Sequence, residues 1–180
     1  MISTVDQSIG FSSERGWNVC LPLGWKVLPK AAGEVSFGLD NVEVFAHPAD
    51  PALSICWICS PKQISQRLWQ HFCQATMMIG SINPAQAQEI MSQAFPLMGK
   101  VVTAFSVVLG DGQRAIELTE EIVPFASSSI EAMRGYHLLM PVKSKETSPL
   151  HMQQLVFYAR QSKFSEEIVD VIKSARSFRQ

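Results

Sequence analysis

Apolar and polar residues alternate along several segments in the second half of the chain, and a period of two residues is typical of strands. In residues 114–123, Ile116, Leu118 and Ile122 share one face while polar residues share the other. Gly110-Asp111-Gly112, just ahead of this segment, is a strong hairpin signal. The pattern predicts these strands: Val101–Leu109, Arg114–Val123, Arg134–Val142 and His151–Ala159.

Shorter apolar runs, separated by turn residues, fill the first third of the chain. Pro22-Leu23-Gly24 and Asp40-Asn41 have the composition of tight turns. Pro48 and Pro51 interrupt the chain before another apolar run. We therefore predict further strands here: Trp17–Leu21, Trp25–Leu28, Glu34–Leu39, Val42–Ala46 and Leu53–Cys59.

The period of the pattern changes to helical spacing after residue 60. Ser60 as N-cap and Pro61 at the first helical position predict a helix that starts there and extends to Ile79. Asn83-Pro84 predicts a second helix by the same chemistry, and that helix is expected to end before Gly99. The two segments are expected to form a helix pair between two β-rich parts of the chain.

A last helix is expected after Ser162, close to the C-terminus. Its apolar residues follow helical spacing: Phe164, Ile168, Val171, Ile172 and Ala175. A modest basic cluster lies in the same region: Arg160, Lys163, Lys173, Arg176 and Arg179. Acidic residues interrupt this cluster, so a solvated helix face is the favoured interpretation.

The order of elements predicts an α+β fold, with an antiparallel sheet sandwiched by helices. The segments 101–109 and 151–159 carry apolar residues on both faces. Either helices cover both faces of the sheet, or one apolar face is left open for a partner. We expect residues 1–15 to form a flexible N-terminal arm and residues 16–180 to form a single domain.

Composition and charge narrow the classes of function. A net charge of −1 disfavours nucleic acid as a partner, because phosphate binding needs a basic excess. No run approaches the ~18 apolar residues that mark a membrane span. Residues 1–16 lack the basic and apolar regions of a signal peptide. We therefore expect a cytoplasmic protein without a membrane span.

The cysteines are the most prominent candidates for chemistry. Cys56 and Cys59 form a C-x-x-C pair, but it precedes the expected helix, and residues three apart on a strand point to opposite faces. Buried structural cysteines are favoured, and a thiol-based redox site is the alternative. Zinc binding by these two with His71 and Cys73 is disfavoured, because residues two apart on a helix face about 200° from each other.

Other polar residues do not form a recognisable catalytic pattern. Glu117, Glu120 and Glu121 are acidic residues on one strand, and we expect them to lie on a solvated face. The histidines lie far apart in the sequence, and no serine or cysteine stands in a known nucleophile motif. Met77 and Met78 are expected at the end of a helix, where methionine suits adaptable apolar surfaces. We expect no catalytic residue, metal or cofactor.

Three short motifs resemble those of a known superfamily. They are Leu21-Pro22-Leu23-Gly24-Trp25, the segment 112–118 after the glycine turn, and the closing Ser177-Phe178-Arg179. Together they resemble the fold shared by PsbP, the Ran-binding Mog-type nuclear import factors and the Eag-type chaperones of bacterial type VI secretion. The resemblance implies a single α/β/α sandwich that binds proteins and is not an enzyme. Eag-type members cradle apolar helices of secreted effectors, often as dimers.

The leading hypothesis is a non-enzymatic protein-binding module, of the kind of a cytoplasmic secretion chaperone or adaptor. It would bury an apolar segment of its partner against the sheet face and a methionine-lined groove. A secreted effector is one candidate partner, and a homodimer is one candidate assembly. Strand alternation suggests these contact residues: Phe105, Val107, Met140, Met152, Val156 and Tyr158. The alternatives are a redox enzyme that uses Cys56 and Cys59, and a protein that holds a small apolar ligand under its helices.

Overall fold

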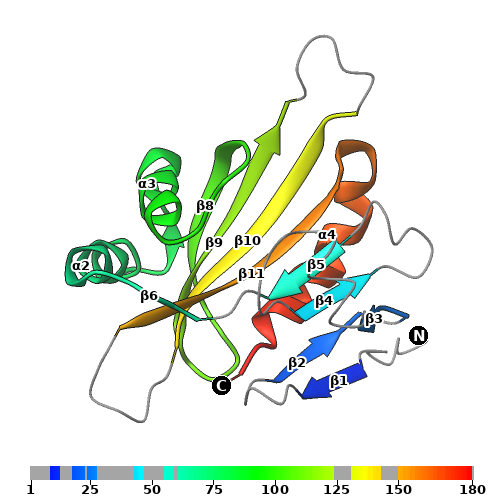
Figure 1. Ribbon diagram of the computed structural model, residues 1–180, viewed down its shortest axis with the longest axis horizontal. Coiled ribbons are helices and arrows are strands. Elements are labelled where there is room, and N and C mark those ends of the chain that lie inside the picture. Colours follow the sequence, from blue (N-terminus) through cyan, green and yellow to red (C-terminus); the bar gives the residue numbers. More distant parts are fainter. Residues whose placement is uncertain are drawn as a thin grey trace.

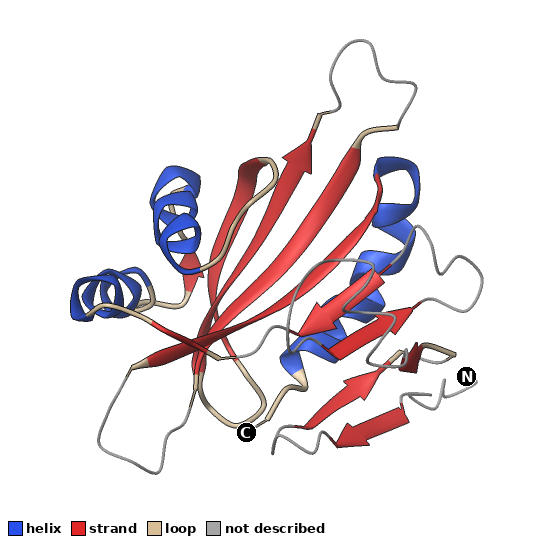
Figure 2. Ribbon diagram, in the orientation of Figure 1, coloured by secondary structure: helices blue, strands red, loops and turns tan. Residues whose placement is uncertain are grey.

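The structure is a computed structural model with helices on both sides of an antiparallel sheet (Figures 1 and 2). It describes residues 9–12, 18–22, 24–27, 43–46, 55–58, 61–123, 131–142 and 150–179. The strands of the main sheet lie in the order β3 (Lys26–Val27), β4 (Glu43–Ala46), β5 (Ile55–Ile58), β11 (His151–Arg160), β10 (Met133–Pro141), β9 (Arg114–Ile122), β8 (Lys100–Val108) and β7 (Gly80–Ser81).

The middle of the sheet is the long antiparallel pair of β10 and β11. Their register extends from Met133 opposite Arg160 to Pro141 opposite Met152. β11 also pairs with β5 on its other side, and the short β6 (Lys62–Gln63) pairs with the start of β11. A separate pair, β1 (Ile9–Ser12) with β2 (Asn18–Leu21), lies near β3 and β4 (Figure 1). The predicted strands of the second half are confirmed to within one or two residues.

Helices cover both faces of the sheet. The helix-pair face carries α2 (Gln66–Ala75) and α3 (Pro84–Ala94), and the α4 face carries α4 (Gln161–Arg176) (Figure 1). Because side chains alternate along a strand, neighbouring residues of the central strands contribute to different cores. Leu138 joins the core under α4, and Leu139 joins the core under the helix pair. The expected α+β class with an antiparallel sheet between helices is confirmed.

The start of α2 differs from the predicted one. The N-cap is Ser65, whose side chain accepts a hydrogen bond from the backbone N–H of Leu68 at 3.1 Å. Lys62 and Gln63 pair with β11, so the backbone reaches helical conformation later than Pro61. The helix also ends earlier than predicted, with Thr76 as its C-cap.

The start of α3 agrees with its prediction. Pro84 occupies the first turn, and the Asn83 side chain accepts a hydrogen bond from the N–H of Ala85 at 2.9 Å. α4 begins at Gln161, directly after β11 and slightly before the expected start. Both helices keep the predicted apolar stripes toward the sheet, including Ile90 in α3 and Val171 in α4.

One described segment of the predicted N-terminal arm forms a strand. Ile9–Ser12 lies within the expected arm 1–15 but forms β1, and the Phe11 ring packs edge-on against Phe45 with a centroid distance of 5.3 Å. The backbones of Asn18 and Arg179 exchange hydrogen bonds of 2.8 and 2.9 Å. The start of β2 is therefore fastened to the C-terminal end of the described chain. The predicted strand 34–39 and its turn lie outside the described residues.

We expect Ser65→Ala to lower the free energy of unfolding by about 1 kcal/mol, because the N–H of Leu68 loses its side-chain partner. Urea unfolding followed by circular dichroism measures this change. Ser92→Ala, in the exposed part of α3, is the control, since its hydroxyl bonds only the carbonyl of Glu89. Equal effects of the two substitutions would contradict the assignment of Ser65 as the cap.

Candidate functional site

The predicted partner-contact residues lie on both faces of the sheet. Phe105, Val107 and Met140 point to the α4 face, and Met152, Val156 and Tyr158 point to the helix-pair face. A side chain must be exposed to contact a partner. The exposed fractions are 45% for Phe105, 9% for Val107, 5% for Tyr158, 2% for Val156 and 0% for both methionines. The predicted open sheet face is therefore wrong for five of the six residues. Val107 and Met140 belong to the core under α4, and Met152 belongs to the core under the helix pair. Val156 and Tyr158 are also buried, on the helix-pair face.

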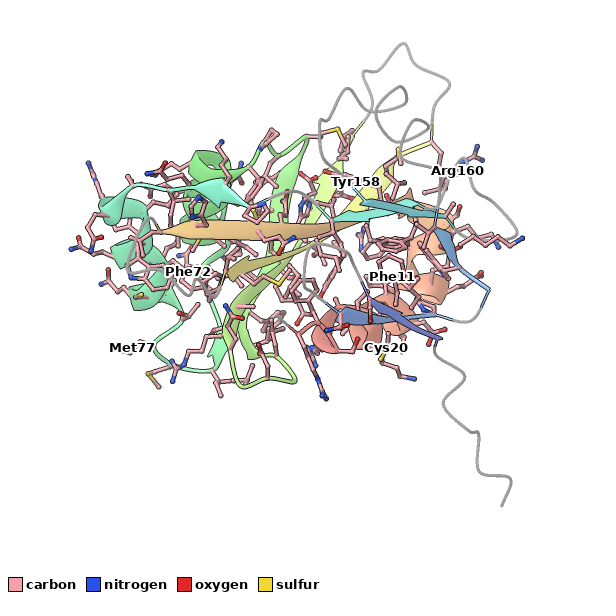
Figure 3. The ribbon with its side chains drawn as sticks, turned by 60° about the horizontal axis from the view of Figure 1, so that its bottom comes forward. Phe11, Cys20, Phe72, Met77, Tyr158 and Arg160 are labelled. Carbon is pink, nitrogen blue, oxygen red and sulfur yellow. The ribbon has the colours of Figure 1, made fainter. Side chains whose placement is uncertain are left out.

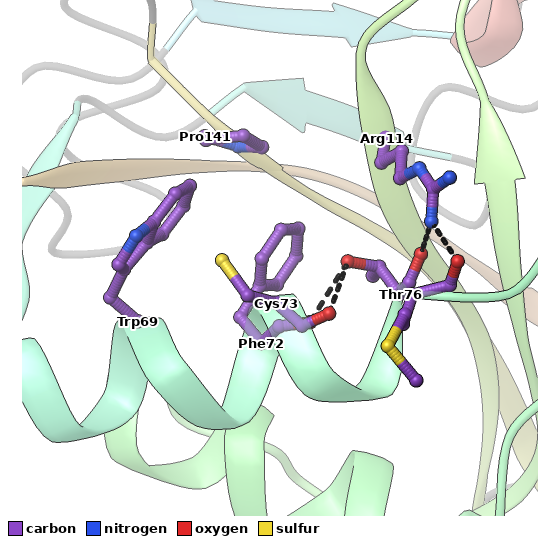
Figure 4. A pocket seen from close by; sticks show the side chains of 7 residues that line it. Trp69, Phe72, Cys73, Thr76, Arg114 and Pro141 are labelled. Atoms are coloured by element: carbon purple, nitrogen blue, oxygen red, sulfur yellow. Dashed lines mark hydrogen bonds between the residues drawn. The ribbon is translucent and has the colours of Figure 1, made fainter.

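An open pocket lies instead beside α2, where the helix meets the ends of β9 and β10. Its volume is about 420 Å³. Figure 4 shows the indole of Trp69 and the thiol of Cys73 pointing from α2 toward Pro141. The pocket is lined by Trp69, Phe72, Cys73, Thr76, Met77, Arg114 and Pro141. We call these seven residues the α2 pocket.

Helical spacing explains why α2 supplies most of this lining. Trp69, Cys73 and Thr76 stand four and three residues apart, so they share one side of the helix. Phe72 faces the core beneath the pocket and is 2% exposed. The rings of Trp69 and Phe72 stack with a centroid distance of 5.6 Å and an interplanar angle of 15°. The floor and one wall of the pocket are therefore held rigidly by aromatic packing.

Arg114, at the start of β9, fixes the position of the helix end. Its Nη1 donates hydrogen bonds to the carbonyl oxygens of Thr76 and Met77 (Figure 4). The Thr76 hydroxyl donates to the carbonyl of Phe72 at 2.9 Å. The two bonds from Arg114 tie the carbonyl groups at the C-terminal end of α2 to β9, and the Phe72 carbonyl also accepts from the backbone N–H of Thr76. A cation at this end also complements the helix dipole.

The chain leaves α2 through an unusually apolar and exposed turn. Met77, Met78 and Ile79 are 68%, 77% and 67% exposed. Figure 3 shows Met77 projecting from the edge of the molecule. These residues follow the helix, whereas the sequence pattern predicted the methionines at its end. Three consecutive large apolar side chains in water, next to an apolar pocket, mark a surface suited to a partner.

The cysteine candidates lie in different parts of the fold. Cys73 is an exposed residue that lines the α2 pocket, and partial desolvation raises the pKa of its thiol, so the thiolate form is disfavoured. Cys56 lies in β5, while Cys59 is outside the described residues, so the redox hypothesis for this pair stays a prediction. Within the described ranges, no three His, Cys, Asp or Glu residues gather closely enough to hold a metal ion.

A second polar constellation is buried under the helix pair. Glu120 of β9, His137 of β10, and Gln154 and Tyr158 of β11 form a hydrogen-bonded chain across three strands, which we call the polar network. His137 Nε2 lies 2.9 Å from a Glu120 carboxylate oxygen, and Gln154 Nε2 lies 2.8 Å from His137 Nδ1. With the amide in this orientation, His137 is protonated on Nε2 and donates to Glu120.

Glu120 is held as a carboxylate in this network. Burial raises the pKa of Glu120, but the hydrogen bonds donated by His137, Tyr158 and Gly99 lower it by more, so the net pKa lies below the ordinary value. The Gly99 N–H donates to the other carboxylate oxygen at 2.7 Å. Both oxygens are therefore satisfied, as a buried charge requires.

Gly135 of β10 makes room for this arrangement. It lies opposite both Glu120 and Tyr158 in the register, so it separates them across the sheet. A Cβ atom at this position would lie only 2.9 Å from the Glu120 Cγ and closer still to the Tyr158 ring. The missing side chain allows the Tyr158 hydroxyl to cross β10 and donate to Glu120. A glycine within a strand marks such a close approach.

The predicted solvated acidic strand is wrong for two of its three residues. Glu117 is 5% exposed on the α4 face, where Arg176 donates to it from Nε at 3.1 Å and from Nη2 at 2.8 Å. Glu120 is fully buried on the opposite face. Sequence reasoning missed both sites because their partners come from other strands and from α4. Only Gly135 within a strand hinted at the polar network.

The polar network does not form an open active site. Glu120, His137, Gln154 and Tyr158 are 0%, 1%, 3% and 5% exposed, so a reactant in solution does not reach them in this conformation. Their arrangement fixes the register of three strands and excludes other pairings, because a slip would leave a buried carboxylate without partners. The α2 pocket is thus the better candidate for binding.

Comparisons with known proteins bear on the fold. No family model matches the chain, and no curated protein matches it. The chain is similar to the crystal structure of LpqN, which is described as involved in cell envelope biogenesis of Mycobacterium tuberculosis. The match covers 97% of this chain and 86% of LpqN, with a TM-score of 0.52 and 14% sequence identity. At this identity the likeness shows a shared fold alone. Among the described helices, none combines the length and apolarity needed to cross a bilayer.

We expect Gly135→Ala to lower the free energy of unfolding by about 2–3 kcal/mol, because the added methyl group overpacks the site and displaces Tyr158 from Glu120. Gly10→Ala is the matched control, since nothing lies within 4 Å of a Cβ atom there. Chemical denaturation of both variants measures the difference. A change of similar size in the two variants would show that Gly135 has no special role.

We expect the stability difference between the wild type and Glu120→Gln to depend on pH. Since the folded-state pKa of Glu120 is lowered, ionisation stabilises the fold above the ordinary pKa of 4.5, and this contribution is lost as pH falls below it. Urea unfolding at about pH 3, 4, 5 and 7 tests the sign. Glu89→Gln, on exposed α3, is the control for losing a carboxylate. A difference that stays constant or grows as pH falls would contradict this account.

Proposed function

We propose that this protein is a non-enzymatic binding module that takes an apolar side chain of a protein partner into the α2 pocket. One observation carries the proposal: an apolar pocket of about 420 Å³ stands next to the exposed turn Met77–Ile79. The central strands β10 and β11 bury most of their residues on both faces, whereas Phe105 in β8 is 45% exposed. The apolar surface that remains accessible at this end is suited to a partner.

The extent of this surface favours a protein segment over a small molecule. A small molecule that filled the pocket would leave Met78 and Ile79 in water, since neither lines the pocket. A helix or extended segment can insert one side chain and also cover the turn beside it. Methionine side chains adapt to different shapes, so the turn can pack against such a segment.

The chemistry of the pocket favours binding over catalysis. Partial desolvation raises the pKa of its one thiol, Cys73, and no carboxylate or imidazole is among the seven lining residues. The acid–base pair His137 and Glu120 is enclosed under the helix pair. If the Eag-type resemblance holds, the apolar helix of a secreted effector would use the α2 pocket and not the sheet face.

We expect a displayed library of random peptides, selected on the wild-type protein, to yield peptides with a shared large apolar residue. Met77→Glu should weaken their binding at least tenfold, since it places a charge at the mouth of the pocket. Val169→Glu, at an exposed position on α4, is the matched control and should bind like the wild type. Thermal unfolding checks that both variants fold.

Two results would contradict the proposal. Selected peptides that bind Met77→Glu as well as the wild type would place the binding surface elsewhere. A selection that yields no peptide with an apolar anchor, from a protein shown to be folded, would remove the α2 pocket as a docking site for protein segments.

A further inference from the structure

We infer that Arg114 makes the α2 pocket selective for a segment that carries a carboxylate beside its apolar side chain. This inference rests on the proposed function, because it names the partner chemistry of the same pocket. It concerns a residue that the sequence showed only as the first position of a strand.

Arg114 has more donors than its structural role uses. Only Nη1 donates to the carbonyl oxygens of Thr76 and Met77. A guanidinium group has five N–H donors, of which Nε and Nη2 present three. None of those three has a hydrogen-bond partner among the residues that the structure describes. The Nε–Nη2 edge is also the one that binds a carboxylate side-on through two parallel hydrogen bonds.

The charge of Arg114 has no acidic counterpart nearby. Across the described part of the chain, no carboxylate lies within ion-pair distance of it. The sequence contains no Asp or Glu between residues 61 and 88, a stretch that includes all of α2 and the exposed turn. The side chain of Asp111, in the nearby hairpin turn, accepts a hydrogen bond from the N–H of Gln113 at 3.0 Å. A partner's carboxylate would therefore meet attraction and no repulsion from this stretch.

The position of Arg114 links its charge to the apolar pocket. Its side chain lines the pocket together with Trp69 and Pro141, so an occupant's polar group at the mouth would meet the guanidinium. In Figure 4 the guanidinium stands across the pocket from Trp69, and its other nitrogen atoms point away from the helix carbonyls. Binding sites commonly combine an apolar cavity, which holds the apolar part of a ligand, with one oriented polar or charged group, which holds the ligand's polar end.

Three small probes with one apolar chain and different head groups test the inference: octanoate, octanol and octylamine. Binding is followed by nuclear magnetic resonance through the indole N–H of Trp69 and the methyl group of Met77. We expect wild-type protein to bind octanoate roughly three- to tenfold more tightly than octanol, the range for a partly exposed charged pair, and octylamine most weakly. The preference should weaken in high salt, while octanol binding should not.

Substitutions of Arg114 assign the preference to this residue. Arg114→Gln should bind octanoate and octanol equally, and Arg114→Lys should keep part of the preference through its charge. Arg67→Gln is the matched control, because Arg67 is an exposed arginine on α2 outside the pocket lining. Octanol binding by Arg114→Gln shows whether the pocket survives the substitution. If the pocket does not survive, two other results decide whether Arg114 causes the preference for octanoate: its salt dependence in the wild type, and its partial retention in Arg114→Lys.

The outcomes separate this inference from the proposed function. Equal binding of octanoate and octanol by the wild type would overturn the role of Arg114 and leave the apolar pocket in place. Absence of binding by all three probes would argue against the pocket itself.

A final experiment compares peptides with Glu or Gln beside the apolar anchor. A Glu preference that Arg114→Gln abolishes supports a protein partner, while octanoate binding without any peptide binding would overturn that choice in favour of a free amphiphile.

Discussion

The fold depends on the burial of both faces of β11. This strand pairs with β10 on one side and with β5 and β6 on the other, so most of its backbone lies between two strands. Its residues from Met152 to Ala159 are all buried. Such a strand is stable only when both faces are covered, because each exposed large apolar side chain forfeits roughly 1.5–3 kcal/mol. Helices on both sides, and not an open sheet face, satisfy this requirement.

The same requirement shapes the polar groups of the sheet. Gln154 and Tyr158 alternate with apolar residues on the helix-pair face of β11, and they are satisfied by His137 and Glu120 of the neighbouring strands. A carboxylate in this position is tolerated only with several donors in place. Gly135 provides the space for one of them. The polar network therefore favours one register of the central strands, and it requires a glycine at position 135.

Local sequence signals predicted the fold well where they were strong. The glycine turn at residues 110–112, the cap Asn83 and the alternation along β9 placed their elements within one or two residues. The start of α2 was wrong because Ser65 and Ser60 offer similar capping signals, and pairing of Lys62 with β11 decides between them. The arm 1–15 was wrong in part because the contact of Phe11 with Phe45 joins residues far apart in the chain.

The candidate site was much harder to predict than the fold. Alternation placed Met140 and Met152 on strand faces, but it does not tell whether a helix covers them. The α2 pocket combines a helix with residues such as Arg114 and Pro141, which come from other strands and show no sequence pattern of their own. The visible signals were the consecutive Met77, Met78 and Ile79 and the absence of acidic residues around them.

Methionine oxidation distinguishes the methionines buried in the central strands from those exposed in the turn after α2. Brief exposure of the folded protein to hydrogen peroxide, followed by peptide mass spectrometry, reports the accessibility of each methionine. The account predicts rapid oxidation of Met77 and Met78, which are 68% and 77% exposed, and protection of Met140 and Met152, which are fully buried. Oxidation of Met140 or Met152 as fast as Met77, in protein that stays folded, would contradict it and restore the open sheet face.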